Sequence, residues 1–409
     1  MKVLQVNCNG YYGSTGKIVR KLSAYLTEMG EEDFIACSGY REKSTDEKTY
    51  CVSGNLTVKL NQTASYLCGD AGFHFGLTTK KLIRLIREQK PDIVHLHHLE
   101  SYFINVVELA EFLQREKIPT VWTMHDCWPF TGHCTHFFSV GCDKWKTGCH
   151  DCPQKKDFPY SLFLDRSRSL FEKKKKAFSN WENLHIVNVS RWMQGMVKRS
   201  FLGNKDMRVI YNGIDPKSFY PSETAGQCKQ KLGLEGKFVI LSVASSWSEK
   251  KGWSEFLKLA EKLGEDEKIV LVGVNEKQAE ELPSGILGIP KVRSIDALRD
   301  YYSMADVYLN LSLEETFGLV SVEAMACGTP VIACNTTANP EIAAPECGVI
   351  LQERKTDQIL DALRNVRANG KAFYAEVCRN RVKSHFSEAA MCEGYYKLYS
   401  EILGKRGKS

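Results

Sequence analysis

Two glutamates separated by seven residues stand in the stretch SLEETFGLVSVEAMACGTPVIAC, residues 312–334. Gly318 lies in the approach to a predicted helix, and Gly328-Thr329-Pro330 ends that helix and begins a buried strand. In an unbroken helix Glu315 and Glu323 would lie about 12 Å apart, beyond the ~5–9.5 Å between the paired carboxylates of glycoside hydrolases. A carboxylate can accept two hydroxyl protons at once, as from a ribose diol or a sugar. The spacing therefore favours two acceptors along a hydroxyl-rich ligand.

Other candidate residues follow predicted strands of the first half. Gly13-Ser14-Thr15-Gly16 joins a strand to a helix, where glycine lets the backbone approach a ligand and free N–H groups attract an anion. An ordinary strand-to-helix turn explains it equally well, and it is neither a Walker A loop nor a GxGxxG fingerprint. His125 ends another strand and either contacts a ligand or is satisfied locally. His95 and His97 share one face of a strand, where packing explains them as well as function does.

Five of the 15 cysteines fall between Cys127 and Cys152, and histidines lie among them. Cys149-His150-Asp151-Cys152 is a C-x2-C pair, a spacing that suits one tetrahedral zinc ion. The predicted all-thiolate structural zinc site consists of Cys134, Cys142, Cys149 and Cys152, with His133 or His136 as substitutes. Reduced thiols without metal and disulfides are the alternatives.

Short β-branched runs alternate with amphipathic stretches along the whole chain, which indicates an α/β fold with parallel sheets covered on both faces. The expected strands are 2–8, 33–39, 92–98, 120–126, 185–191, 208–214, 237–244, 268–274, 307–312, 330–335 and 348–352. They form two groups, so we expect two Rossmann-like, doubly wound domains. Parallel sheets bind ligands at the carboxyl ends of their strands, and two facing sheets would create a cleft there.

The expected boundaries follow from breaks in this pattern. An N-terminal Rossmann-like domain spans 1–215 and carries the Cys/His-rich insert at about 127–152, on its side of the expected cleft. A polar linker, 216–236, leads to a C-terminal Rossmann-like domain over 237–386. The last segment, 387–409, is a periodic helix with no strand after it, free to cross back onto the first domain.

Composition excludes several classes of protein. The 409 residues are 43% hydrophobic and 25% charged, an ordinary globular mixture that argues against disorder, collagen and low complexity. No apolar run approaches the ~18 residues of a membrane span. The N-terminus MKVLQVNCNGYYG is typical of a first strand rather than a signal peptide. We therefore expect a cytoplasmic protein, in which an odd number of cysteines does not form a disulfide framework.

The positive charge concentrates in two segments, 80–90 and 166–176, which mix basic residues with Leu, Ile or Phe at helical spacing. They are either solvated helix faces or amphipathic surfaces for anionic lipid, which would make the protein peripheral on the inner face of the plasma membrane. No zinc-finger, RNP or helix-turn-helix pattern supports nucleic acid as a partner.

Taken together, the motifs resemble those of the retaining glycosyltransferases of family 4, which have the GT-B fold of two Rossmann-like domains. The resemblance rests on E-x7-E followed by AMACGTPVIA, and on PDIVHLHH (91–98), TMHD (123–126) and VIYNGID (209–215). It covers essentially the full length. TMHDCWPFTGHC further resembles the bacterial exopolysaccharide branch, including the colanic-acid type.

The resemblance implies roles for residues of the second domain, which would bind the nucleotide sugar. Glu323 would bind the ribose and Glu315 the transferred sugar. The backbone of Phe317, Gly318 and Leu319 would meet sugar or phosphate at the helix start.

Charge and catalysis are assigned in the same way. Lys251, with Lys250 beside it, matches the lysine that neutralises the departing diphosphate. Gly13 and Gly16 would lie against that diphosphate, and His125 matches the histidine near the reacting sugar.

The chain departs from the family in two places. Ser245 and Ser246 stand where an arginine is expected, and Ala338-Asn339 stand where many members have a glycine pair, although Glu341 is retained. Adjacent lysines supply charge but no bidentate fork.

The resemblance implies a retaining transferase that needs no catalytic cofactor. It would move a sugar from a UDP or GDP sugar to a saccharide, lipid-linked acceptor in bacterial surface polysaccharide synthesis. A sugar-nucleotide epimerase or a phosphorylase of the same fold is the alternative. A non-catalytic, zinc-stabilised binding module is disfavoured by the intact E-x7-E block.

Overall fold

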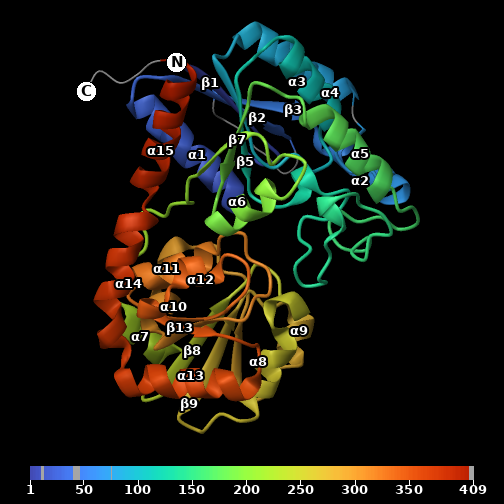
Figure 1. Ribbon diagram of the computed structural model, residues 1–409. Helices are drawn as coiled ribbons and strands as arrows, with labels where there is room; N and C mark the ends of the chain where they lie inside the picture. Colours follow the sequence, from blue (N-terminus) through green and yellow to red (C-terminus); the bar gives the residue numbers. More distant parts are fainter. Residues whose placement is uncertain (11–12, 40–46, 75, 405–409) are drawn as a thin grey trace. The chain divides into compact units, whose positions relative to one another are not determined.

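The structure, a computed structural model, describes residues 1–10, 13–39, 47–74 and 76–404 and forms two compact units (Figure 1). The first comprises Met1–Ile210 and the C-terminal segment that begins at Cys392, and the second is Tyr211–Met391. Each contains one parallel β-sheet. The predicted α/β class with two Rossmann-like sheets is confirmed.

The sheet of the first unit has seven strands within the described ranges, in the order β3-β2-β1-β4-β5-β6-β7. All neighbouring strands are parallel. The strands are β1 (Lys2–Asn7), β2 (Glu32–Ser38), β3 (Thr49–Ser53), β4 (Ile93–Leu96), β5 (Thr120–Met124), β6 (Leu184–Asn188) and β7 (Asp206–Val209). Every residue of β4 and β5 is buried, as a parallel sheet covered on both faces requires.

Two helices of the first unit, α4 (Val106–Arg115) and α6 (Arg191–Lys198), begin where a side chain accepts hydrogen bonds from free backbone N–H groups. At the start of α4, the side chain of Asn105 accepts hydrogen bonds from the backbone N–H groups of Val107 and Glu108. At the start of α6, the side chain of Ser190 accepts one from the N–H of Met193. The helices are α1 (Gly13–Glu28), α2 (Asn55–Cys68), α3 (Gly76–Gln89), α4 (Val106–Arg115), α5 (Ser167–Phe178) and α6 (Arg191–Lys198), with the 3₁₀ helices η1 (Trp128–Phe130) and η2 (Lys144–Lys146).

The second sheet has six strands among the residues described, in the order β10-β9-β8-β11-β12-β13, again all parallel. The strands are β8 (Phe238–Val243), β9 (Glu267–Val272), β10 (Ile286–Ile289), β11 (Val307–Asn310), β12 (Val331–Cys334) and β13 (Gly348–Leu351). The helices are α7 (Ala225–Lys231), η3 (Glu249–Lys251), α8 (Trp253–Ala260), α9 (Glu276–Glu280), α10 (Ile295–Met304), α11 (Leu319–Ala326), α12 (Asn339–Ala343), η4 (Pro345–Cys347), α13 (Thr356–Asn369), α14 (Lys371–His385) and α15 (Glu388–Ile402).

The structure differs from the predicted boundaries in the segment 216–236. This segment contains α7 and is bonded to the second unit rather than forming a free linker. The backbone N–H of Ser222 donates to Ser303 Oγ at 3.0 Å, and Lys229 Nζ lies 3.1 Å from Asp306 Oδ2. The chain therefore divides at Tyr211. Polar composition suggested a linker, but in this segment the polar side chains form specific contacts.

The helix α15 contributes to both units. From Cys392 onward it belongs to the first unit, where its tyrosines are bonded to the central strands. Tyr395 Oη lies 2.9 Å from Thr123 Oγ1 of β5, and Tyr399 Oη lies 2.7 Å from His95 Nδ1 of β4. Both tyrosines are fully buried, so this part of α15 completes the core over the first sheet.

Within the described ranges, every helix is too short or too polar to serve as a membrane-spanning segment.

Candidate active site

The two glutamates of the E-x7-E block lie on either side of a glycine with left-handed backbone. Gly318 has φ 92° and ψ 57° and precedes α11, so Glu315 lies in the loop after β11 and Glu323 in the second turn of the helix. A side chain at position 318 would be strained at this φ. The loop breaks the continuous helix that would hold the carboxylates far apart, and it presents the first backbone N–H groups of α11 beside them.

Lys251 is paired with the first of these glutamates. Its Nζ lies 2.5 Å from Glu315 Oε1, and Lys250 Nζ lies 3.5 Å from Glu314 Oε2. The backbone supports both pairs, because the N–H of Leu313 donates to the carbonyl oxygen of Lys250 at 2.9 Å. The carboxylates are mostly covered, whereas each ammonium group is about one-third exposed (36%). The loops after β8 and β11 thus place two cations beside two acidic side chains.

Glu323 is held by a tyrosine of α10. Tyr302 Oη donates to Glu323 Oε2 at 2.8 Å. Burial, and then the negative charge of Glu323, raise the pKa of Tyr302 well above its ordinary value, so it remains a donor at neutral pH. This hydrogen bond fixes the orientation of the Glu323 carboxylate.

A buried amide network fixes the loop between the glutamates. Asn339 Nδ2 donates to Ser312 O at 3.2 Å, and Asn310 Nδ2 donates to Ser321 Oγ at 3.1 Å. The N–H of Ala338 donates to Glu315 O at 3.1 Å. Ala338 and Asn339, which replace the glycine pair of many family members, therefore hold the E-x7-E loop in place. Their side chains are buried.

A hollow of about 1340 Å³ lies at the carboxyl ends of β8, β9 and β10. Ser245, Asn275 and Lys291 are among its lining residues. Gly273 follows β9, and a Cβ there would stand 1.8 Å from Ala244 O, so only glycine allows the strand ends to approach this closely. Sequence reasoning missed this hollow. The strand-end rule could have indicated it in part, since two expected strands, 237–244 and 268–274, end at or beside its lining residues.

The first unit places His125 in a cluster of histidines after β4 and β5. His125 Nε2 lies 3.1 Å from His97 Nδ1, and the rings of His95 and His97 are 3.9 Å apart. Burial lowers the pKa of His125, His97 and His95 well below the ordinary value, so these rings are neutral at pH 7. Neutral imidazoles can accept or donate a hydrogen bond to a hydroxyl group.

His98 has the opposite charge state. Burial alone would lower its pKa, but the charge of Glu100, a hydrogen bond with Cys8 and the charge of Asp126 raise it to about 10. Its Nε2 lies 3.4 Å from Asp126 Oδ2. A cationic histidine therefore lies beside the neutral ring of His125, at a ring-centroid distance of 5.2 Å.

The predicted glycine turn opens α1. Gly13 is the first helical residue, with φ 75°, and Gly16 lies buried in the first turn. That turn contains no acidic residue, and the helix is 16 residues long. The positive end of the helix dipole is therefore not neutralised by its own side chains, which suits an anion.

The predicted zinc ligands gather at one place in the first unit. Cys134, Cys142, Cys149 and Cys152 all line one small cavity, which His133 also lines. Metal binding by these residues remains a prediction at this point.

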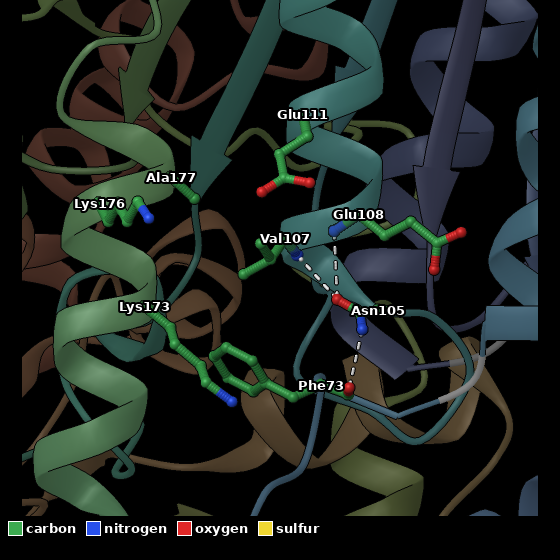
Figure 2. Close-up of a pocket in the computed structure, with 8 residues that line it drawn as sticks. All are labelled: Phe73, Asn105, Val107, Glu108, Glu111, Lys173, Lys176 and Ala177. Atoms are coloured by element: carbon green, nitrogen blue, oxygen red, sulfur yellow. Dashed lines mark hydrogen bonds between the residues drawn. The ribbon is translucent and has the colours of Figure 1, made fainter.

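The predicted amphipathic segments turn their apolar residues inward. In α3 the side chains of Leu82, Leu85 and Ile86 are buried in the core, as are Leu170 and Phe171 of α5. Around a pocket between α4 and α5, Lys173 and Lys176 share the lining with Glu108, Glu111 and Phe73 (Figure 2). Except for the buried Lys174, the basic residues of the two segments face solvent or acidic neighbours, as on an ordinary solvated helix. The apolar residues that define the two amphipathic faces pack against protein.

Comparisons with known proteins establish the family. The model described as Glycosyltransferase Family 4 matches residues 15–218, and the model described as Glycosyl transferases group 1 matches residues 226–383. Together the two matches include almost all of both sheets and most of the residues discussed above. The chain belongs to glycosyltransferase family 4 and is a glycosyltransferase.

Two relatives illustrate the breadth of this similarity. WcaC of Escherichia coli K12, which carries the name of a colanic acid biosynthesis glycosyl transferase, is 25% identical over 80% of this chain and 81% of its own length. N-acetyl-alpha-D-glucosaminyl L-malate synthase of Bacillus anthracis is 26% identical over 98% of both chains.

Solved structures share the fold. Sucrose-phosphate synthase from Thermosynechococcus elongatus superposes with a TM-score of 0.70 at 17% identity, covering 98% of this chain and 99% of its own. Anabaena Alr3699/HepE, solved in complex with UDP-glucose, superposes with a TM-score of 0.68 at 15% identity, covering 98% and 100%. At this identity the likeness shows the fold alone, which is GT-B.

Proposed function

We propose that this glycosyltransferase moves a sugar from a nucleotide-diphosphate sugar to a saccharide acceptor, with retention of anomeric configuration, in the synthesis of a bacterial surface polysaccharide. The observation that carries the proposal is the pairing of Lys251 with Glu315 next to the left-handed Gly318. The pairing places a cation, a carboxylate and the start of a helix close together. The cation and the helix start suit a diphosphate, and the carboxylate suits the hydroxyl groups of a sugar.

The donor would be held by the second unit. Glu323, oriented by Tyr302, accepts the ribose hydroxyls, and Glu315 accepts a hydroxyl of the transferred sugar. The backbone at Phe317, Gly318 and Leu319 meets the diphosphate at the positive end of α11. The hollow beyond β8, β9 and β10 has room for the nucleobase. Support comes from HepE, which was solved with UDP-glucose and with UDP.

Lys251 and Lys250 would stabilise the leaving diphosphate as the glycosidic bond breaks. Fixed charges in a partly dry site stabilise a developing anion more strongly than water does. Lys251 forms an ion pair with Glu315. Donor binding would turn Lys251 toward phosphate while Glu315 engages the sugar, so the resting ion pair keeps both side chains in place.

Residues of the first unit would serve the acceptor and the transfer step. The resemblance to the family assigns His125 to the reacting sugar and Gly13 and Gly16 to the diphosphate. The neutral state of His125 fits a hydrogen bond with a hydroxyl group, and its contact with His97 fixes the ring. Hydrogen bonding of this kind positions a nucleophilic hydroxyl for attack.

The acceptor we propose is a saccharide on a lipid carrier, reached at the inner face of the membrane. The apolar faces of α3 and α5 are buried in the protein, so we place the proposed membrane contact on another surface. Leu56, Leu60 and Leu67 lie about one face of α2 and are 71%, 62% and 47% exposed. Beside the end of α2, exposed Leu162, Phe163 and Leu164 continue this surface, since the N–H of Leu162 donates to Tyr66 O.

These six side chains form what we call the apolar patch. Lys59, Lys155 and Lys156 stand in or beside it, and Lys155 Nζ donates to Phe163 O at 3.3 Å. Apolar groups surrounded by lysines fit an anionic bilayer surface. A lipid-active relative, alpha-monoglucosyldiacylglycerol synthase of Acholeplasma laidlawii, is 26% identical over 64% of this chain and 63% of its own length.

The test begins with thermal unfolding in the presence of UDP, GDP, ADP and their sugars, without added metal. A ligand at about 100 times its dissociation constant adds about 2.7 kcal/mol of stability. A shift with one nucleotide identifies the donor base. Product analysis by NMR then reports the anomeric configuration. Reaction without acceptor would indicate an epimerase, phosphate dependence would indicate a phosphorylase, and no shift with any nucleotide would contradict the proposal.

A further inference from the structure

Residues 125–166, all of them described, join β5 to α5 with neither α-helix nor strand and contain only η1 and η2 (Figure 1). Loops longer than about 12–15 residues without secondary structure are uncommon in compact domains. Part of this segment is nevertheless packed like a core. The rings of Phe137 and Trp145 stack 4.6 Å apart, and Phe130 contacts Trp145 at 5.6 Å. Aromatic packing alone leaves most of the backbone without regular hydrogen bonds.

Four cysteines of this segment surround one small cavity. Cys134 and Cys149 are buried, and Cys142 and Cys152 are half-buried. Cys134 and Cys152 share a side-chain hydrogen bond. All four are free thiols. Cysteines from three separate turns of the chain therefore line the same cavity.

The local backbone is shaped to present sulfur. The N–H of Gly132 donates to Cys149 Sγ at 3.2 Å. Between Cys149 and Cys152, Lys144 Nζ donates to the carbonyl oxygens of His150 and Asp151 at 3.0 and 3.1 Å. These bonds hold the C-x2-C turn closed, so that both of its sulfurs come from one tight loop.

Two buried polar side chains lie beside the cysteines. Among the described residues, one has a ring nitrogen without a hydrogen-bond partner, and the other is a lysine without a carboxylate partner. His133 is 4% exposed and lines the cavity, yet its Nε2 has no hydrogen-bond partner among the described residues. Lys174 is fully buried, donates to the carbonyl oxygens of Trp128 and Thr131 and lies over the Trp128 ring at 3.4 Å, but within the described chain no carboxylate lies within ion-pair distance of it. Orphaned buried donors and unpaired buried cations are costly and call for an explanation.

We propose that Cys134, Cys142, Cys149 and Cys152 bind one Zn²⁺ ion in a closed, tetrahedral, structural site. Four thiolates around Zn²⁺ carry a net charge of −2, which would compensate the buried ammonium of Lys174. His133 is a second-layer donor whose Nε2–H bonds to a zinc-bound sulfur, as ligand-orienting groups around metals do. On binding, four thiols release four protons to solvent, and no oxidant or reductant is required.

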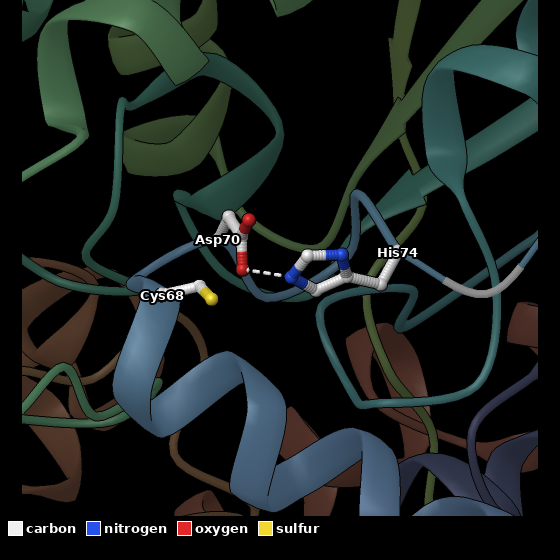
Figure 3. Close-up of side chains that lie close together, drawn as sticks. All are labelled: Cys68, Asp70 and His74. Atoms are coloured by element: carbon white, nitrogen blue, oxygen red, sulfur yellow. Dashed lines mark ion pairs between the residues drawn. The ribbon is translucent and has the colours of Figure 1, made fainter.

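The thiols must turn inward to bind the ion. Three ligand atoms that all lie within 4.8 Å of one another occur, among the described residues, at Cys68–Asp70–His74 (Figure 3) and at His98–Glu100–Asp126, and not at these cysteines. The two compact groups are less suited to metal, because each already pairs a histidine with a carboxylate, and Arg166 Nη1 lies 3.4 Å from Asp70.

The test measures zinc in the full-length protein, purified without chelator from zinc-supplemented cells. Elemental analysis should find about one zinc ion per chain, and X-ray absorption should find four sulfur neighbours at about 2.3 Å. The double variant Cys149→Ser/Cys152→Ser should lose the zinc. The matched control Cys51→Ser changes an exposed cysteine outside the cluster and should retain it. His133→Ala should also retain the metal.

The wild-type measurements keep the inference testable even if the double variant does not fold. A zinc content far below one per chain would overturn it, as would mass loss showing disulfides among the four cysteines. Three sulfur neighbours and one nitrogen, with zinc lost from His133→Ala, would overturn the four-thiolate assignment. Because the site is structural, its zinc content is measured independently of nucleotide-sugar binding.

Discussion

The Nζ of Lys251 lies 2.5 Å from Oε1 of Glu315, which joins the loop after β8 to the loop after β11. Leu313 and Lys250 add a backbone hydrogen bond between the same loops, and Arg354 Nη1 donates to both Glu249 O and Leu311 O, at 2.9 and 3.3 Å. Since Arg354 is committed to these carbonyls, it does not supply the arginine that Ser245 and Ser246 lack. Lys251 and Lys250 are therefore the cations of this loop that we expect a diphosphate to meet.

Lys251→Met should lower kcat by about 100-fold or more, the usual cost of losing one group that stabilises a leaving anion. The KM for the donor should rise less, because the charge on the diphosphate grows as the bond breaks. The measurement is steady-state transfer with the donor found by thermal unfolding. Lys258→Met, which removes a lysine of α8 paired with Glu255, is the matched control and should leave both constants unchanged. Equal losses in both variants would remove Lys251 from the site.

Glu323 and Tyr302 should affect donor affinity. Glu323→Ala removes the proposed ribose acceptor and should abolish the thermal shift with nucleotide. Tyr302→Phe removes one hydrogen bond to a charged group, worth about 1.5–3 kcal/mol, and should weaken nucleotide binding by about 10-fold or more. Isothermal titration with the free nucleotide measures both. Unchanged affinity in Glu323→Ala would refute the ribose role.

His125 should affect turnover rather than affinity. His125→Ala should lower kcat by about 100-fold, within the range of a positioned hydrogen-bonding group, with nucleotide affinity changed less than threefold. His97 Nδ1 lies 3.1 Å from His125 Nε2, so His97→Ala acts only through the position of His125 and should lower kcat less. His185→Ala is the control, because this histidine pairs with Asp206 elsewhere in the unit. A parallel loss of affinity would contradict the assigned role.

Much of the fold could be predicted because buried parallel strands have continuous apolar sequences. All eleven expected strands are present, and the two missed ones, β3 and β10, stand at the ends of their sheets. TYCVS and ILGI are short, and they pair on one side only, so their patterns are weak. Local periodicity therefore did not predict these two strands.

Features of the site that depend on distant residues could not be predicted. His95 is bonded to Tyr399, 304 positions away, which no local pattern reveals. Lys174 belongs to a run of four lysines, yet it alone of the four is fully buried. Helical spacing indicated that 80–90 and 166–176 are amphipathic, but spacing does not tell whether the apolar side meets protein or lipid. In both helices it meets protein.

Asp33 should make stability depend on pH. Burial, more than offsetting hydrogen bonds from Ser23 and Gln5, raises its pKa to about 7 in the folded protein, against about 3.9 unfolded. The folded state therefore binds more protons between these values. The stabilisation that proton binding at Asp33 contributes is at most about 4 kcal/mol. It is complete below pH 4 and is lost as the pH rises to 7.

Asp33→Asn should remove that slope. The amide stays neutral, and its N–H can reach Gln5 Oε1, which has no hydrogen-bond partner among the described residues. Urea unfolding of both proteins from pH 5 to 9 compares their free energies of unfolding. The variant should gain stability relative to wild type as pH rises to 7 and keep a constant advantage above it. Parallel curves would show that Asp33 does not titrate as described.

The apolar patch should bind anionic membranes. Leu60→Glu and Phe163→Glu place a negative charge among exposed apolar side chains and should reduce sedimentation with vesicles of phosphatidylglycerol and phosphatidylethanolamine by about tenfold, since each change removes apolar contact and adds repulsion. Phe373→Glu changes a similarly exposed phenylalanine of α14, at 67%, and should have no effect. Binding should fall with added salt because the lysines contribute. If wild type fails to sediment, or if Phe373→Glu weakens binding equally, the patch is not the membrane contact and a water-soluble acceptor becomes the better explanation.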